Sequence, residues 1–185
     1  MTAESYQPLR SWLDAHPAAK RCVVALDRWL PLVPFLCYPV LLILLNVRFF
    51  RLFPVRKDAA LDFSMDIVRS IFVPGLTFWG GTLLRDRLNR LRPYEQPGFE
   101  PLVHKKTRGH SFPSRHALSA AVLAMVWMYF YPVVGWVMVG ITMLICIGRV
   151  LTGVHHVRDV IFGAALGAWN VVFLLTANTY RLCST

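Results

Sequence analysis

The stretch "ALSAAVLAMVWMYFYPVVGWVMVGITMLICIG", residues 117–148, holds two long apolar runs that little more than Pro132 separates. The hydrocarbon core of a bilayer is about 30 Å thick, and an α-helix needs roughly 20 apolar residues to cross it. The runs 117–131 and 133–148 approach this length and predict two membrane-spanning helices. Because so little chain joins them, the two helices are expected to form a tight hairpin.

The rest of the chain has the same apolar character. Of its 185 residues 56% are hydrophobic and only 16% are charged, whereas soluble domains carry about 25% charged residues. Further spans are predicted at 29–47, at 71–84 as the end of a helix that starts near Leu61, and at 160–177. The sequence therefore predicts an all-α, polytopic membrane helix bundle with about five transmembrane helices, in a single domain covering residues 1–185.

The first 26 residues differ from these spans in composition. They have no apolar core followed by a small-residue cleavage site, so a cleavable signal peptide is not expected. Residues 5–26 fit either an irregular tail or an amphipathic helix lying on the membrane surface with Trp12 and Leu13 inserted. We treat residues 1–26 as an N-terminal interfacial segment.

The charge balance narrows the class of ligand. The chain carries 20 Lys and Arg against 10 Asp and Glu, a net charge of +10. Such an excess suits nucleic acid, anionic lipid or a phosphorylated substrate. The cations flank apolar spans instead of forming a stripe on a soluble fold, which argues against nucleic acid. The cysteines show no CxxC spacing and predict neither a zinc site nor a disulfide framework; they are Cys22, Cys37, Cys146 and Cys183.

The predicted topology brings distant polar segments to one end of the bundle. With five antiparallel spans, the ends of the second and fourth share a face with the starts of the third and fifth. That face collects the clusters 85–92, 114–116 and 149–159. The connecting residues 92–114 predict a non-helical loop, because Pro and Gly punctuate them.

The first cluster is "RDRLNRLRP", which begins at Arg85. Arg85 and Arg92 are seven residues apart, so on one helix they would point the same way. Pro93 is expected to end that helix directly after Arg92. Two guanidinium groups on one face suit a tetrahedral oxyanion. A basic collar at the membrane surface is the alternative interpretation.

The second cluster is "HSFPSRHALS", residues 110–119. Ser114 is expected to cap the following helix, leaving its first backbone N–H groups free at the positive end of the helix dipole, where phosphate binds well. His116, in the first turn, can give a proton to a leaving oxygen. An ordinary helix cap beside an interfacial histidine is the alternative.

The third cluster is "GRVLTGVHHVRD". Arg149 ends the fourth span, Gly153 turns the chain, and His155 and Asp159 lie four residues apart. On a helix, Asp159 would hold a ring N–H of His155 and leave the other ring nitrogen as a nucleophile or base. His156 would face about 100° away. A surface Asp–His pair is the alternative.

Together the three clusters resemble the type 2 phosphatidic acid phosphatase family, the lipid phosphate phosphatases, which share their site with vanadium haloperoxidases. The family pattern is Lys-x6-Arg-Pro, Pro-Ser-Gly-His and Ser-Arg-x5-His-x3-Asp. This chain reads Arg85-x6-Arg92-Pro93, Pro113-Ser114-Arg115-His116 and Gly148-Arg149-x5-His155-x3-Asp159. It departs from the pattern at Arg85, which keeps a cation, at Arg115, which adds one, and at Gly148, which removes a hydroxyl.

The resemblance implies a role for each matched residue. His155 would attack phosphorus to form a phosphohistidine, with Asp159 orienting its ring. His116 would protonate the leaving oxygen and then activate water. The residues that would hold the phosphate are Arg85, Arg92, Ser114, Arg115 and Arg149. The resemblance implies no cofactor and no metal, and His104 and His110 are expected to be loop histidines without a catalytic role.

Three functions remain open at this point. The first is a lipid phosphatase in the cell membrane that hydrolyses a phosphomonoester or diphosphate, such as phosphatidate, phosphatidylglycerophosphate or a polyprenyl diphosphate like undecaprenyl diphosphate. The second is a phosphotransferase that uses a polyprenyl diphosphate donor. The third is a transporter or structural protein that binds anionic lipid. Lys and Arg in residues 48–57 favour a cytoplasmic loop there, but the catalytic face carries even more. The family resemblance alone implies an extracytoplasmic active site.

Overall fold

The computed structural model describes residues 1–182, and the side chains of residues 1–169. Within them the chain is helical and has no strand, which confirms the all-α prediction. The elements are α1 (Ala3–Ala15), α2 (Pro17–Trp29), α3 (Leu32–Leu52), α4 (Lys57–Leu88), the 3-10 helix η1 (Pro93–Glu95), α5 (Arg115–Phe130), α6 (Pro132–Leu151) and α7 (Val157–Leu182).

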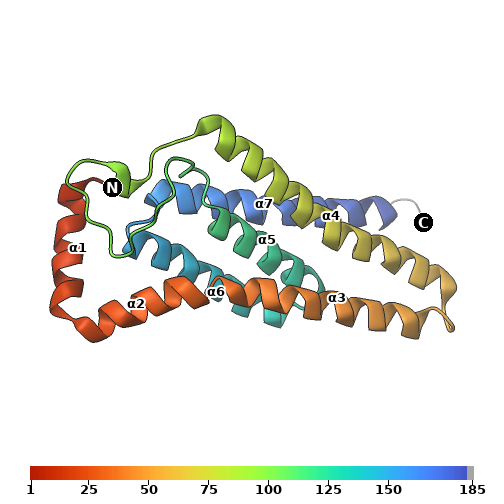
Figure 1. Ribbon diagram of the computed structural model, residues 1–185. Helices are drawn as coiled ribbons and strands as arrows, with labels where there is room; N and C mark the ends of the chain where they lie inside the picture. The colour runs from red at the N-terminus through yellow and green to blue at the C-terminus, as the bar shows by residue number, and fades with distance from the viewer. Residues whose placement is uncertain (183–185) are drawn as a thin grey trace.

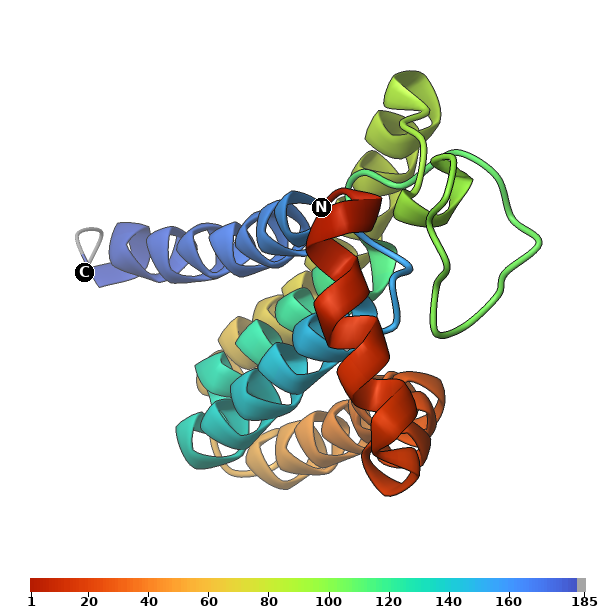
Figure 2. The ribbon, with the colours of Figure 1, turned by 90° about the vertical axis from the view of Figure 1, so that its left-hand side faces the viewer.

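The polar loops gather at one end of the long helices. Figure 1 shows the α4–α5 and α6–α7 connections beside α1 at this end, and the α3–α4 turn at the opposite end. Viewed from the polar end, α1 crosses in front of the bundle and the long loop before α5 stands to one side (Figure 2). The predicted convergence of the three clusters at one face is therefore present.

The chain is a membrane protein with three helical stretches that are long and apolar enough to cross a bilayer. They are Pro17–Leu52, Lys57–Glu95 and Pro132–Leu151. The predicted count of five spans is thus only partly matched, because α5 has 16 residues and the side chains of α7 beyond residue 169 lie outside the described residues. The predicted hairpin is confirmed: α5 ends at Phe130 and α6 begins at Pro132.

The N-terminal segment is helical and not an irregular tail. The Thr2 hydroxyl accepts from the backbone N–H of Ser5 at the start of α1, and Pro17 opens α2, where its missing N–H has no cost. Trp12 is exposed, but Leu13 is buried within the protein. The expectation that Leu13 inserts into the membrane surface is therefore wrong. Cys22, Cys37 and Cys146 are free thiols, and Cys183 lies outside the described residues.

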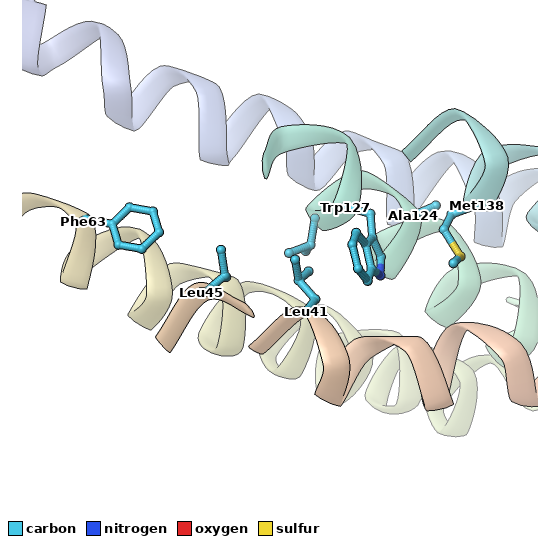
Figure 3. Close-up of a cluster of buried hydrophobic side chains, with 7 residues drawn as sticks. Leu41, Leu45, Phe63, Ala124, Trp127 and Met138 are labelled. Carbon is cyan, nitrogen blue, oxygen red and sulfur yellow. The ribbon is translucent and has the colours of Figure 1, made fainter. Parts of the chain in front are cut away.

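The apolar core lies between α3, α4, α5 and α6. Leu41 and Leu45 of α3 are fully buried against Trp127 of α5, Phe63 of α4 and Met138 of α6 (Figure 3). These positions belong to the first halves of α4 and α6 and the second half of α5, so the core lies in the part of the bundle remote from the polar loops.

Two glycines let α7 approach α5 closely. A Cβ atom on Gly163 would lie 2.7 Å from the carbonyl oxygen of Ser114, and one on Gly167 would lie 2.6 Å from that of Leu118. No side chain fits there without displacing backbone. The start of α5 is also tied to the start of α7, because the backbone N–H of Ser114 donates to the carbonyl oxygen of Asp159 at 3.0 Å. This contact places the second and third clusters side by side.

Candidate active site

The polar end of the bundle buries an unusual number of polar and charged side chains. Burying such groups is costly unless they find partners or serve a ligand. Each of the following is at most 6% exposed: Arg85, Arg92, Ser111, Ser114, Arg149, Thr152, His155 and Asp159. Every predicted cluster contributes to this set.

Arg85 and Arg92 reach the site by a different route from the one predicted. Helix α4 ends at Leu88, because Asn89 adopts the left-handed conformation (φ 34°), and Arg92 is extended (φ −85°, ψ 161°). The expectation that both arginines lie on one helix ending at Pro93 is wrong. Both side chains nevertheless line one cavity of about 300 Å³.

Contacts to the loop before α5 hold Arg92 in place. Its Nε donates to the carbonyl oxygen of Gly109 at 2.9 Å, and its backbone N–H donates to Oε2 of Glu95 at 2.8 Å. The Glu95 carboxylate also accepts from the backbone N–H of Gly109 at 2.9 and 3.0 Å. Gly109 has φ +62°, a conformation that favours glycine. The loop therefore fixes the guanidinium against the cavity.

Ser114 occupies the N-cap position of α5, but its hydroxyl makes no capping hydrogen bond. The predicted side-chain cap is therefore wrong. The hydroxyl oxygen is fully buried and has no hydrogen-bond partner among the described residues. A buried hydroxyl without a partner is costly, and it is the type of group that a bound anion would satisfy.

His155 and Asp159 are brought together by a loop and not by one helix turn. Helix α7 begins at Val157, so the helical placement predicted for His155 and His156 is wrong. Even so, Nδ1 of His155 lies 3.8 Å from Oδ2 of Asp159. That oxygen also accepts a short hydrogen bond from the Ser111 hydroxyl and one of 3.1 Å from the backbone N–H of His156. These donors fix the carboxylate on the Nδ1 side of the ring.

His155 is neutral at pH 7. Burial lowers its pKa to about 4; the contact with Asp159 opposes this shift, and the charge of Arg92 adds to it. A neutral imidazole with a carboxylate beside Nδ1 presents the lone pair of Nε2. The backbone N–H of His155 also donates to the carbonyl oxygen of Arg149 at 3.2 Å, which links the ring to the end of α6.

His116, the second residue of α5, lines a neighbouring cavity of about 260 Å³ together with Phe35, Phe78, Arg115 and Ser119. Arg115 also lines the cavity of Arg85 and Arg92, so the two cavities adjoin. Electrostatic interactions link His116 to Arg149, Lys105 and His155. Side chains from all three sequence clusters therefore lie in or next to these two adjoining cavities.

Three residues near the site were not found from the sequence: Ser111, Lys105 and Asp27. Ser111 supports Asp159, as described above. Burial and the charge of Arg149 lower the pKa of Lys105, and Asp27 opposes this. Asp27 contacts Arg149 from α2. One feature of the sequence could have drawn attention to Asp27: it is an acidic residue two positions before the first apolar run.

The remaining predictions concern histidine and metal. Nδ1 of His110 lies 3.3 Å from Oδ1 of the exposed Asp86, at the rim of the arginine cavity. Among the residues that the structure describes, no group of three His, Cys, Asp or Glu side chains is arranged to hold a metal ion. The charged side chains that line the arginine cavity are four arginines and one carboxylate: Arg85, Arg92, Arg108, Arg115 and Asp86.

Curated relatives cover the part of the chain that carries these motifs. The human sphingosine-1-phosphate phosphatase 2 is 32% identical over 123 residues, which cover 62% of this chain and 31% of the relative. Phosphatidylglycerophosphatase B of Bacillus subtilis (strain 168) is 35% identical over 96 residues, covering 46% and 44%. Undecaprenyl-diphosphatase of Sulfolobus acidocaldarius is 35% identical over 82 residues, covering 43% and 39%. The chain thus spans less than half the length of each of these relatives.

Solved structures resemble nearly the whole chain. A transmembrane PAP2-type phosphatidylglycerolphosphate phosphatase from Bacillus subtilis has a TM-score of 0.53 and 25% identity, covering 95% of this chain and 92% of that one. Aquifex aeolicus LpxE has a TM-score of 0.61 with 20% identity, covering 92% and 93%, and shares the fold. The model of the PAP2 superfamily matches residues 66–182, which include every predicted motif. The chain therefore belongs to the PAP2 superfamily.

Proposed function

We propose that the protein is an integral membrane lipid phosphatase that hydrolyses a phosphomonoester or diphosphate of a lipid headgroup. The observation that carries this proposal is a buried, neutral His155 with a fixed carboxylate at Nδ1, under the charges of Arg92 and Arg149. This arrangement suits attack on a phosphorus atom. The names of the curated relatives, all phosphatases or diphosphatases of phosphorylated substrates, support the same class.

The first step transfers the phosphoryl group to the enzyme. The Nε2 lone pair of His155 forms a bond to phosphorus as the bond between phosphorus and the lipid oxygen breaks. The negative charge of the bound phosphate favours the protonated form of His116. This ring gives its proton to the leaving oxygen, so the lipid leaves as an alcohol or, from a diphosphate, as a monophosphate. Asp159 stabilises the positive charge that develops on the His155 ring.

The second step releases phosphate. Neutral His116 takes a proton from water, and the water oxygen attacks the phosphohistidine. The bond between phosphorus and Nε2 breaks, its electron pair returns to His155, and inorganic phosphate leaves. His116 is then protonated again and ready for the next substrate, so the protons balance over one turnover.

Charge stabilisation is the main demand of phosphoryl transfer. We assign it to the guanidinium groups and the unpaired Ser114 hydroxyl described above, that is, to Arg85, Arg92, Ser114, Arg115 and Arg149. Because these groups supply positive charge and donors at fixed positions, the proposed reaction needs no metal ion. Turnover should therefore be unaffected by millimolar EDTA, and a loss restored by a divalent cation would refute this part.

We further propose that α3 to α7 each cross the cell membrane and that the site opens at its extracytoplasmic surface. The three apolar stretches contain α3, α4 and α6, while α5 and α7 pack against each other beside them. A Gly98→Cys variant in a background without native cysteines tests the side, since Gly98 lies in the loop of the polar end. Labelling by an impermeant thiol reagent from outside is expected; labelling only after permeabilisation would reverse the orientation.

Phosphate release from purified protein tests the enzyme assignment. A panel should contain phosphatidate, phosphatidylglycerophosphate and undecaprenyl diphosphate. His155→Ala is expected to reduce turnover by at least about 1,000-fold, because it removes the nucleophile. His156→Ala is the matched control, as it removes the neighbouring buried ring and should keep turnover within a few-fold. Undiminished turnover of His155→Ala would refute the assignment.

A further inference from the structure

Asp27 is a buried carboxylate close to the C-terminal end of α2, outside the residues 66–182 that match the superfamily. It is 7% exposed. A buried charge is strongly destabilising unless it is paired, so its partners indicate what it does. Those partners are Arg149 and Thr152, both at the end of α6 where the candidate active site begins.

The contact with Arg149 engages several atoms of the guanidinium group. Its Nε lies 3.3 Å from Oδ1 of Asp27, Nη1 lies 3.4 Å from Oδ2, and Nη2 lies 3.4 Å from the Asp27 carbonyl oxygen. Contacts to all three nitrogens of a planar guanidinium group set its orientation. They use at most three of its five N–H groups, so the remaining donors are left for an anion.

Thr152 contacts the same carboxylate oxygen of Asp27 as Nε of Arg149. Its hydroxyl lies 3.4 Å from Oδ1 of Asp27 and 2.8 Å from the carbonyl oxygen of Gly148. Thr152 is fully buried, which leaves the carboxylate little freedom to turn away. Asp27, a residue of the N-terminal helices, therefore determines where the Arg149 guanidinium group lies.

The N-terminal helices are themselves fastened to the loops around the site. The Tyr6 hydroxyl donates to the carbonyl oxygen of Leu151 at 2.7 Å, and its ring stacks on Phe99 with centroids 4.7 Å apart. Nη1 of Arg10 donates to the carbonyl oxygen of Pro101 at 2.7 Å. Contacts to the end of α6 and to the loop before α5 hold α1, and α2 follows directly after it, so Asp27 approaches Arg149 from a fixed support.

We propose that Asp27 is a positioning residue that holds the Arg149 guanidinium in the orientation required to bind the transferring phosphoryl group. The proposal rests on the function proposed above. In phosphoryl transfer, misplacing a charge-stabilising group by about 1 Å can cost on the order of 100-fold in rate. The N-terminal helices thereby complete the site and do more than attach the chain to the membrane surface.

The test compares Asp27→Asn with wild type, using phosphatidate as substrate and orthovanadate as an analogue of the five-coordinate transition state. Asp27→Asn should lower kcat by about 10- to 100-fold, change KM by less than about 3-fold, and weaken vanadate inhibition by a similar factor to kcat. Asp27→Glu should restore part of the loss. Glu4→Gln removes the charge of an exposed carboxylate in the first turn of α1 and is the control with unchanged kinetics.

A double-mutant cycle separates positioning from a structural role, and it remains informative if Asp27→Asn alone fails to fold. If Asp27 acts through Arg149, the Asp27→Asn/Arg149→Ala protein should turn over within about 2-fold of Arg149→Ala. A further loss of 10-fold or more in the double variant would overturn the proposal. So would wild-type kcat and vanadate inhibition in folded Asp27→Asn.

Failure of this proposal is distinguishable from failure of the proposed function. If wild type releases no phosphate from any lipid phosphate, the function fails, and direct binding of orthovanadate still compares wild type with Asp27→Asn. Weaker binding by the variant supports the positioning role, whereas equal binding refutes it.

Discussion

The core around Trp127 and the site around His155 are buried to a similar degree but by different chemistry. Leu41 and Leu45 are fully buried by apolar neighbours from four helices. His155 and Asp159 are 2% and 0% exposed among charged and polar groups, held by contacts that join α2, α5, α6 and α7. The first region should determine stability with little influence on turnover, and the second should determine turnover. Substitutions in each region test this contrast.

Asp159→Asn should have the largest effect. The amide keeps the size of the side chain but cannot stabilise the positive charge that develops on His155, and it disturbs the hydrogen bond from Ser111. We expect kcat to fall by about 10²- to 10⁴-fold, measured as phosphate release, with little change in thermal unfolding. Asp58→Asn, an exposed carboxylate at the remote start of α4, is the matched control. Activity within a few-fold of wild type in Asp159→Asn would remove the orienting role.

Arg92→Lys should have an intermediate effect. Lysine keeps the charge but loses the planar fork and the Nε contact to Gly109. We expect a loss of about 10- to 100-fold in kcat. Arg87→Lys makes the same change at an exposed position in the last turn of α4 and should be neutral. Equal kinetics for the two variants would show that charge alone matters at residue 92.

The pH dependence of His155 should be displaced toward acid. Its pKa of about 4 in the folded protein lies below the ordinary value of 6.5, so the unfolded chain binds more protons between these values. The stabilising contribution of the neutral ring is therefore complete above pH 6.5 and declines as the pH falls from 6.5 to 4. NMR titration of labelled histidine, assigned with His155→Ala, should show a midpoint near 4. A midpoint near 6.5 would mean that the ring is not desolvated.

Leu41→Ala should have the smallest effect on turnover. It deletes a fully buried side chain of the apolar core, and such deletions reduce the free energy of unfolding by about 2–5 kcal/mol. We expect a lower thermal unfolding temperature in detergent and a kcat per folded molecule within about 2-fold of wild type. A loss of turnover as large as that of Arg92→Lys would show that the two regions are not independent.

The apolar helices could be predicted because the composition of the chain and the length of its apolar runs indicate membrane-spanning segments. Helices α3, α5 and α6 begin and end within a few residues of the expected apolar runs, and Pro132 marks their hairpin. The motif residues could also be placed at one end, because antiparallel helices leave few alternatives. The end of α4 could not be predicted, because it depends on Asn89 adopting a left-handed conformation that Arg92 and its loop contacts accommodate.

Contacts between side chains of distant segments could not be predicted from the sequence. Ser111 bonds to Asp159 across 48 residues, and Asp27 meets Arg149 across 122. Neither pair has a spacing that local periodicity can reveal. The free hydroxyl of Ser114 could not be predicted either, because a serine before a helix normally caps it, and here the hydroxyl makes no capping hydrogen bond.

The most direct test of the account is to trap the covalent intermediate. Protein incubated briefly with lipid phosphate labelled in its phosphoryl group should be quenched in base, where phosphohistidine survives, and the modified peptide identified by mass spectrometry. The proposed mechanism predicts label on His155, none in His155→Ala, and little label in His116→Gln, which can neither protonate the leaving oxygen nor activate water. Label on another residue, or full turnover without a phosphohistidine at any time, would contradict it.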